Sequence, residues 1–306
     1  MANGMASLMV GSSGLRSAQT ALNTTAHNLS NVNTQGYTRQ QVTFTDTTYA
    51  NVFSSSIVPG KYGLGVDIGA ISRVRNDFID RSYRTEYSRL GFYESQANAV
   101  YEVEDWFGEM QGVTYQQHIT DLYNSINELT KNPTSTIARS SLIQNATAFI
   151  DRSQAIYSGL KDYQITLNTE VSSMVDKINE LGQKIYSLNK SISKVEAGGV
   201  ERANDLRDTR DLALDELSQY LDIDYYETTD GQIIISAENI PFVSKSEVNT
   251  MDVRQEGQYG LLIPEWPAYE KDVFSFEKAA SNANNNDKGK LKGLLVARGT
   301  IDVNYQ

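Results

Sequence analysis

The sequence predicts a mainly α-helical protein with a β-rich insert: an elongated coiled-coil helical rod that carries a small β module, in the multidomain α+β class. Two observations predict this fold class. Apolar residues recur on a seven-residue frame for more than fifty positions, from about Ile143 to Val195. At Asp222 the pattern changes to short runs of β-branched and aromatic residues, which are separated by turn residues.

The long frame is most regular in its second half, where apolar residues alternate between the a and d positions of a coiled coil. We call these residues the seam: Val171, Met174, Ile178, Leu181, Ile185, Leu188, Ile192 and Val195. Backwards, the same frame reaches Leu167, Leu160, Tyr157, Ile150, Ala146 and Ile143. Thr134 or Ser135 can cap this helix, and Gly198 ends it. The stripe must lie against other helices of this chain or of a neighbour, and the Lys, Asp, Glu and Asn residues between its apolar positions exclude a membrane span.

A first helix is predicted from about Met5 to Val32. Its apolar stripe consists of four leucines spaced by seven: Leu8, Leu15, Leu22 and Leu29. The residues between them are mostly small and polar, and they include few charges. A helix with so narrow a stripe has little stability alone, so we expect it to need a partner helix.

The following elements are bounded by turn and capping residues. Asn and Gly around positions 28–36 predict a helix stop and a tight turn, and residues 41–75 predict one long hairpin or a pair of short strands. Further helices are expected from Asp77, from Thr114, and from about Glu201 to Leu221. Strands are expected near positions 223–225, 233–235, 242–243, 253 and 261–263.

Composition excludes several function classes. The net charge of -11 and the lack of a Lys/Arg cluster argue against nucleic acid as a partner. The chain has no cysteine, which removes disulfides, thiolate metal sites and cysteine nucleophiles. Residues 1–6 lack the basic and apolar regions of a cleaved Sec-type signal, so export would need another machine.

Four patterns that could suggest a chemical site are better explained by structure. His27 and His118 are each isolated from other ligand types. The glycines of residues 60–65 lack the Lys-Ser/Thr of a phosphate loop, and the acids that begin at Asp222 lack the glycine of a calcium loop. Asp205, Asp208 and Asp211 are interleaved with arginines, which favours an ion-paired helix face over a metal site. We therefore expect no enzyme activity, no cofactor and no metal.

Residues 21–41 (ALNTTAHNLSNVNTQGYTRQQ) resemble the N-terminal signature of bacterial flagellar axial proteins, which are rod, hook and hook-associated proteins. The positions that carry this motif are Asn28, Asn31, Asn33, Gly36 and Tyr37. Residues 63–73 with 77–81, and residues 132–139 with 204–211, are similar to the hook-associated protein 1 (hook-filament junction protein) family, in its N-terminal portion. Each motif is short, but their order and spacing make the resemblance specific.

The resemblance implies a structural subunit of the flagellum at the hook-filament junction, outside the cell. Its partners would be copies of itself, neighbouring axial proteins and the flagellar type III export apparatus, with no cleaved signal peptide, no nucleic acid and no membrane insertion. Terminal helices of such subunits pack in concentric layers, and the family's C-terminal helices are not among these 306 residues. The alternatives are another axial protein, such as the hook or distal-rod subunit, a secreted coiled-coil adhesin, and, more remotely, an enzyme in the β-rich part.

With this resemblance, the chain divides into five segments. Residues 1–36 are expected to form an assembly helix, 37–76 an extended segment or β-hairpin, and 77–221 the helical coiled-coil rod. Residues 222–290 are expected to form the β-rich module, and 291–306 the truncated start of a segment that returns to the rod.

Overall fold

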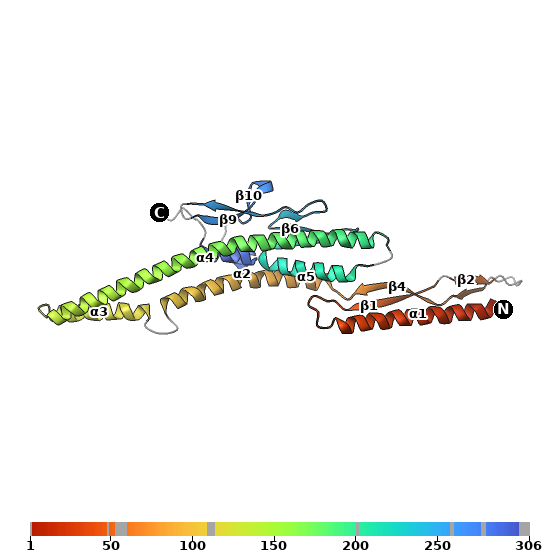
Figure 1. Ribbon diagram of the computed structural model, residues 1–306, viewed down its shortest axis with the longest axis horizontal. Helices are drawn as coiled ribbons and strands as arrows, with labels where there is room; N and C mark the ends of the chain where they lie inside the picture. The colour runs from red at the N-terminus through yellow and green to blue at the C-terminus, as the bar shows by residue number, and fades with distance from the viewer. Residues whose placement is uncertain are drawn as a thin grey trace.

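A computed structural model describes residues 2–47, 49–52, 60–108, 114–199, 202–257, 260–276 and 280–299 of the chain. The molecule is elongated (Figure 1): α1 and a β-hairpin lie at one end, the α3–α4 connection lies at the other, and short strands lie along α4. Helices make up most of the described residues, so the predicted mainly α fold with a β-rich insert is confirmed.

Six α-helices are described: α1 (Ala2–Ser30), α2 (Asp77–Phe107), α3 (Tyr115–Lys131), α4 (Thr136–Glu196), α5 (Asn204–Tyr220) and α6 (Lys290–Arg298). Their starts follow from side-chain caps. Asn76 accepts hydrogen bonds from the backbone N–H groups of residues 78 and 79, while the hydroxyls of Thr114 and Ser135 each accept one from the third residue beyond. Gly108 ends α2 at a φ of 68°, which favours glycine. Ser135 is one of the two caps predicted for α4, and it is confirmed.

Residues after α1 form one long antiparallel hairpin. Strand β1 (Gln40–Asp46) pairs with β4 (Val66–Arg73), and β2 (Tyr49–Val52) pairs with β3 (Gly60–Gly63). The helix α1 lies along this hairpin through small residues: the Ser17 hydroxyl donates to the Val66 carbonyl at 3.4 Å, and the Ser13 hydroxyl accepts from Val66 N–H at 3.3 Å. We call the described residues between 2 and 74 the arm.

Helices α2 to α5 form the rod, and α6 packs onto it. The close approach of these helices depends on glycines. A Cβ atom at Gly91 of α2 would lie 2.5 Å from the carbonyl oxygen of Gln219, and one at Gly293 of α6 would lie 2.4 Å from that of Phe92. The buried face of α2 therefore consists largely of small residues, with one aromatic: Arg84, Ser88, Gly91, Phe92, Ser95 and Ala99.

The β module contains two small antiparallel sheets. One has the order β5 (Ile223–Glu227), β6 (Ile233–Ala237) and β7 (Ile240–Val243). The other has the order β10 (Lys271–Asp272), β9 (Leu261–Trp266) and β8 (Asp252–Glu256). Single 3-10 turns lie at Pro267–Tyr269 and Asn282–Asn284. The predicted strands are present, and residues 228–231 form the turn between β5 and β6.

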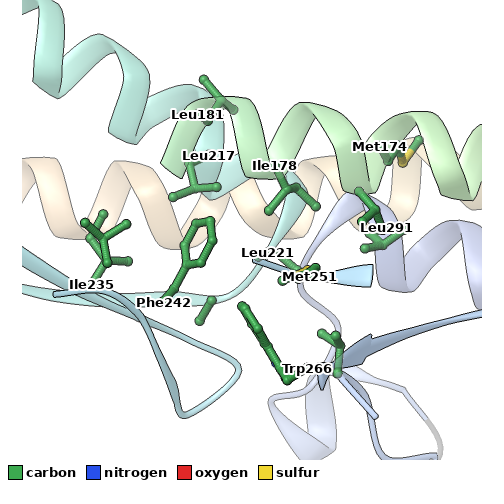
Figure 2. Close-up of a cluster of buried hydrophobic side chains, with 14 of the residues drawn as sticks. Met174, Ile178, Leu181, Leu217, Leu221, Ile235, Phe242, Met251, Trp266 and Leu291 are labelled. Atoms are coloured by element: carbon green, nitrogen blue, oxygen red, sulfur yellow. The ribbon is translucent and has the colours of Figure 1, made fainter. Parts of the chain in front are cut away.

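One apolar core joins the rod to the β module. Figure 2 shows Ile178 of α4 on the side of the helix that faces Phe242 and Trp266 of the strands, whose ring centroids are 5.6 Å apart. Leucines of α5 and α6 complete this core: Leu214, Leu217, Leu291, Leu294 and Leu295. Packing is thus continuous across position 222, and residues 291–298 of the expected return segment pack into the same core. Residues 300–306 lie outside the described residues.

Candidate assembly surfaces

Most of the seam is buried inside the chain. Val171, Ile178, Ile185 and Ile192 are fully buried, and so, within a few per cent, are Met174 and Leu181. At its C-terminal end the seam turns outward: Leu188 is half-buried, and Val195 is 41% exposed.

Residues one step beyond the d positions are buried as well: Val175, Gly182 and Asn189. A straight helix drifts by about 20° per heptad against a strict seven-residue repeat. Most of the seam residues share one apolar core with α5, α6 and strands of the β module. A Cβ at Gly182 would lie 2.4 Å from the Phe242 ring, so the absence of a side chain at this position allows Phe242 of β7 to pack closely against α4.

Three asparagines on α4 hold the β module by its backbone. Asn179 accepts from Met251 N–H at 2.8 Å and donates to the Met251 carbonyl at 2.9 Å. Asn189 does the same with Ile233, and Asn168 accepts from residue 262 and donates to residue 260. An amide side chain can satisfy a strand residue in this way because it carries one acceptor and donors side by side. The sequence analysis missed this role, although the spacing of about three helical turns was a possible signal.

The leucine stripe of α1 is exposed. Leu8, Leu15, Leu22 and Leu29 are 74%, 72%, 64% and 74% exposed, while the small-residue side of the helix contacts the hairpin. The expected partner helix is therefore not present in the described residues, and a β-hairpin supports α1 from the other side.

Two more apolar stripes face solvent. The stripe that the sequence places on one face of α2 is exposed at Ile79, Tyr83, Leu90, Tyr93 and Val100. The backward continuation of the seam frame is exposed at Ile143, Ile150 and Tyr157. Exposed apolar residues are normal singly, but a periodic row of them marks an interaction surface.

The axial-protein motif forms the turn between α1 and β1. The Asn28 side chain accepts from the Tyr37 hydroxyl at 2.7 Å and from Gln40 N–H at 2.9 Å, and it donates to the Gln40 carbonyl at 2.9 Å. The Asn31 amide donates to the His27 carbonyl at 3.0 Å, whereas Asn33 is exposed.

Gly36 and Tyr37 bring this turn against α5 and the end of α1. Gly36 has a φ of 79°, and a Cβ there would lie 3.1 Å from the Leu212 side chain, so glycine suits both the backbone and the contact. The Tyr37 hydroxyl also lies 3.0 Å from His27 Nδ1. The structure thus brings Asn28, Gly36 and Tyr37 together with His27, which the sequence analysis treated as isolated. Hollows of about 740 and 750 Å³ flank the turn, one toward α5 and one between α1 and β1.

Asp208 and Asp211 of α5 pair with arginines, as expected, but not with their sequence neighbours, whereas Asp205 accepts a hydrogen bond from the Gln40 side chain instead. Arg73 of β4 donates to Asp208 at 2.8 Å and to Asp211 at 2.6 Å. Burial alone would raise the pKa of Asp211, but Arg75 and Arg73 lower it below its usual value. Within the described residues, no cluster of three or more His, Cys, Asp or Glu side chains could hold a metal.

The interleaved arginines turn to the other side of α5. Arg207 donates to Glu196 at 2.7 Å and to Glu227 at 2.6 Å, and its hydrogen bond lowers the pKa of Glu196 to about 2. Arg210 donates to Asn189 and to the Gly231 carbonyl. Successive residues on a helix point about 100° apart, so the two sets of charges serve two different neighbours.

A rod with periodic apolar rows on its surface is typical of structural proteins. No described helix is long and apolar enough to span a membrane.

Comparisons with known proteins identify the family. A model described as "Flagellar hook-associated protein FlgK helical domain" matches residues 100–306, and one described as "Flagella basal body rod protein" matches residues 8–38. The chain belongs to the family of the flagellar hook-associated protein FlgK, which confirms the resemblance found in the sequence.

Several relatives match over most of the chain. Flagellar hook-associated protein 1 of Bacillus subtilis (strain 168) is 33% identical over 95% of this chain and 60% of the relative. The protein of the same name from Escherichia coli (strain K12) is 27% identical over 74% of this chain and 41% of the relative. This chain therefore spans about 60% or less of the length of these curated relatives.

A solved structure supports the fold. The flagellar hook junction protein FlgK from Burkholderia pseudomallei matches with a TM-score of 0.54 and 19% identity, over 72% of this chain and 38% of that chain.

Proposed function

We propose that this protein is a structural subunit of the bacterial flagellum, placed at the hook-filament junction and assembled through its terminal helices. The observation that carries the proposal is the exposed leucine stripe of α1, whose other side is already occupied by the hairpin. A stripe that stays exposed in the single chain is available to neighbouring subunits. Because the chain belongs to the FlgK family, we expect the partners of this stripe to be subunits of the flagellum.

The partners that follow are copies of this chain and neighbouring axial proteins. The exposed rows on α2 and on the first half of α4 have heptad spacing, which favours helices as their partners. Residues 1–36 act as the assembly helix, with the seam, 171–195, stabilising the rod beneath the β module. The chain leaves the cell unfolded through the flagellar type III apparatus, is located outside the cell, and performs no catalysis.

Deletion of the gene, followed by electron microscopy of the cells, tests the proposal. Hooks without filaments, restored to filaments by the intact gene, are expected. A complete absence of hooks would favour a hook or distal-rod subunit instead. Normal filaments in the deletion strain would contradict a flagellar role, and binding of the purified protein to host cells would then support an adhesin.

A further inference from the structure

The arm meets the rod on a short stretch of one helix. Hydrogen bonds from the described arm converge on the first turns of α5: Thr38 N–H donates to Asp208 at 2.9 Å, and the Gln40 side chain donates to Asp205 at 2.9 Å. Asn204 donates to the Ile71 carbonyl at 3.0 Å, so both strands of the hairpin base are held.

Arg73 is the charged centre of this contact. Its side chain is 13% exposed, and the same nitrogen reaches Asp208 and Asp211, whose side chains are 6% and 9% exposed. Hydrogen bonds between buried ionised groups are stronger and more directional than neutral ones. A guanidinium left there without its carboxylates would remain desolvated and unpaired, which is unfavourable.

The second side of the cluster belongs to the rod. Arg84 of α2 donates to Asp215 at 2.7 Å, and Arg75, in the segment between arm and rod, donates to Asp80 at 2.6 Å. Arg75 and Arg84 also approach Asp211 at 3.5 and 3.6 Å. Asp211 is thus shared between the arm and α2, whereas Arg73 and Asp208 join the arm to α5.

The apolar core lies elsewhere. Its side chains come from α4, α5, α6 and the β module. Outside this core, Leu212 of α5 is the apolar neighbour of the turn at Gly36. Figure 1 shows the arm extending beyond the end of α5 rather than lying along the rod. The direction of the arm therefore depends on a polar contact, while the stability of the rod depends on the core.

We propose that the carboxylate face of α5 is a latch that sets the direction of the arm relative to the rod, with Arg73 and Asp208 as its positioning residues. The latch holds the assembly helix α1 at a fixed angle, so neighbouring subunits meet a preoriented surface. Preorganisation of this kind favours association because the arm has less freedom to lose. The inference concerns the single chain and does not depend on where the chain assembles.

Distance measurements between two spin labels test the latch. The chain has no cysteine, so Ala18→Cys on exposed α1 and Lys184→Cys on exposed α4 accept labels without other changes. The parent is expected to show one narrow distance peak by pulsed electron spin resonance. Arg73→Gln and Asp208→Asn are each expected to lose that single peak in favour of a broad distribution, with the melting midpoint of the core retained.

Arg254→Gln is the matched control. Arg254 also binds three carboxylates, those of Glu256, Glu265 and Asp272, but it lies in the β module. This variant should keep the narrow peak. A broad distribution in the parent, a narrow one in both latch variants, or equal broadening in the control would overturn the proposal. So would a core melting midpoint that falls together with the peak, because the cluster would then hold the rod itself.

Discussion

Ile178 and Ile150 stand on the same seven-residue frame of α4 but in opposite surroundings. Ile178 is fully buried between α4 and the β module, whereas Ile150 is 52% exposed. An ionised carboxylate in the first position would be unpaired and desolvated, while in the second it would stay in water. We expect Ile178→Asp to lower the free energy of unfolding by several kcal/mol and Ile150→Asp by about 0.5 kcal/mol or less.

Denaturant unfolding of both variants checks this prediction. Ile185→Asp, also at a fully buried position, should behave like Ile178→Asp. An unchanged unfolding midpoint in either buried variant would contradict the placement of the seam.

Glu238 makes the stability of the protein depend on pH. Burial raises its pKa from 4.5 to about 7, against the opposing charge of Lys292 and with repulsion from Asp222 adding to the rise. Between these two values the folded state binds more protons than the unfolded state, so stability falls as pH rises through that window. Glu238→Gln removes the titration and keeps an oxygen that can accept from Asp222 N–H, which the glutamate does at 3.2 Å.

We expect the parent to lose on the order of 1–3 kcal/mol relative to Glu238→Gln between about pH 4.5 and pH 7. Denaturant midpoints of both proteins across this range provide the measurement. Parallel pH profiles would show that burial does not raise the pKa of Glu238 in the folded protein.

At the scale of elements, the contact between α4 and the β module rests on asparagine side chains as well as on the core. Asn179→Ala leaves the backbone N–H and carbonyl of Met251 without these partners, and Met251 is only 3% exposed. Unsatisfied buried groups cost about 1–3 kcal/mol. We expect a loss of that size in unfolding free energy, and little change for Asn23→Ala on exposed α1, where one exposed side-chain bond is lost.

The α1 stripe separates folding from assembly. Leu15 and Leu22 are exposed to solvent, so Leu15→Asp or Leu22→Asp removes little apolar contact within the chain. We expect the melting of the rod and the β module to stay nearly unchanged while incorporation into the flagellum is lost. Thermal melting of the purified variants, together with microscopy of cells that carry them, tests both parts. Normal filaments in these cells would exclude α1 as an assembly surface.

At the scale of the whole molecule, stability should decrease from the core toward the arm. Residues 167–192 of α4 carry most of its buried side chains, whereas α1 exposes its leucines and has one largely buried residue, Ser17, in its described part. Local opening is easiest where few apolar contacts are broken. Hydrogen exchange in a dilute monomer should be fast before Gln35 and slow from 167 to 192. Slow exchange throughout residues 5–32 would mean that the hairpin alone holds α1 firmly.

The sequence by itself determined five of the six described helices, their capping residues, the hairpins and the family, whereas the helix at 290–298 was expected only as part of a return segment. These features depend on local chemistry: Asn76, Thr114 and Ser135 cap helices through hydrogen bonds to residues two or three positions away. The turn motif around Asn28 is equally local, since its partners lie within twelve positions. Such short-range rules can be applied without knowing which elements meet.

Only the tertiary structure decided which face of each helix is covered. A seven-residue repeat identifies an apolar face, but α1 and α2 pack within the chain through small residues and leave that face exposed. The arginine partners of Asp208 and Asp211 were also hidden, because Arg73 is 135 and 138 positions away from them in the chain. Periodicity is a property of one helix, whereas close approach and hydrogen-bond direction are properties of two elements together. For this reason the asparagines of α4 and the latch on α5 emerged only when the elements were placed in space.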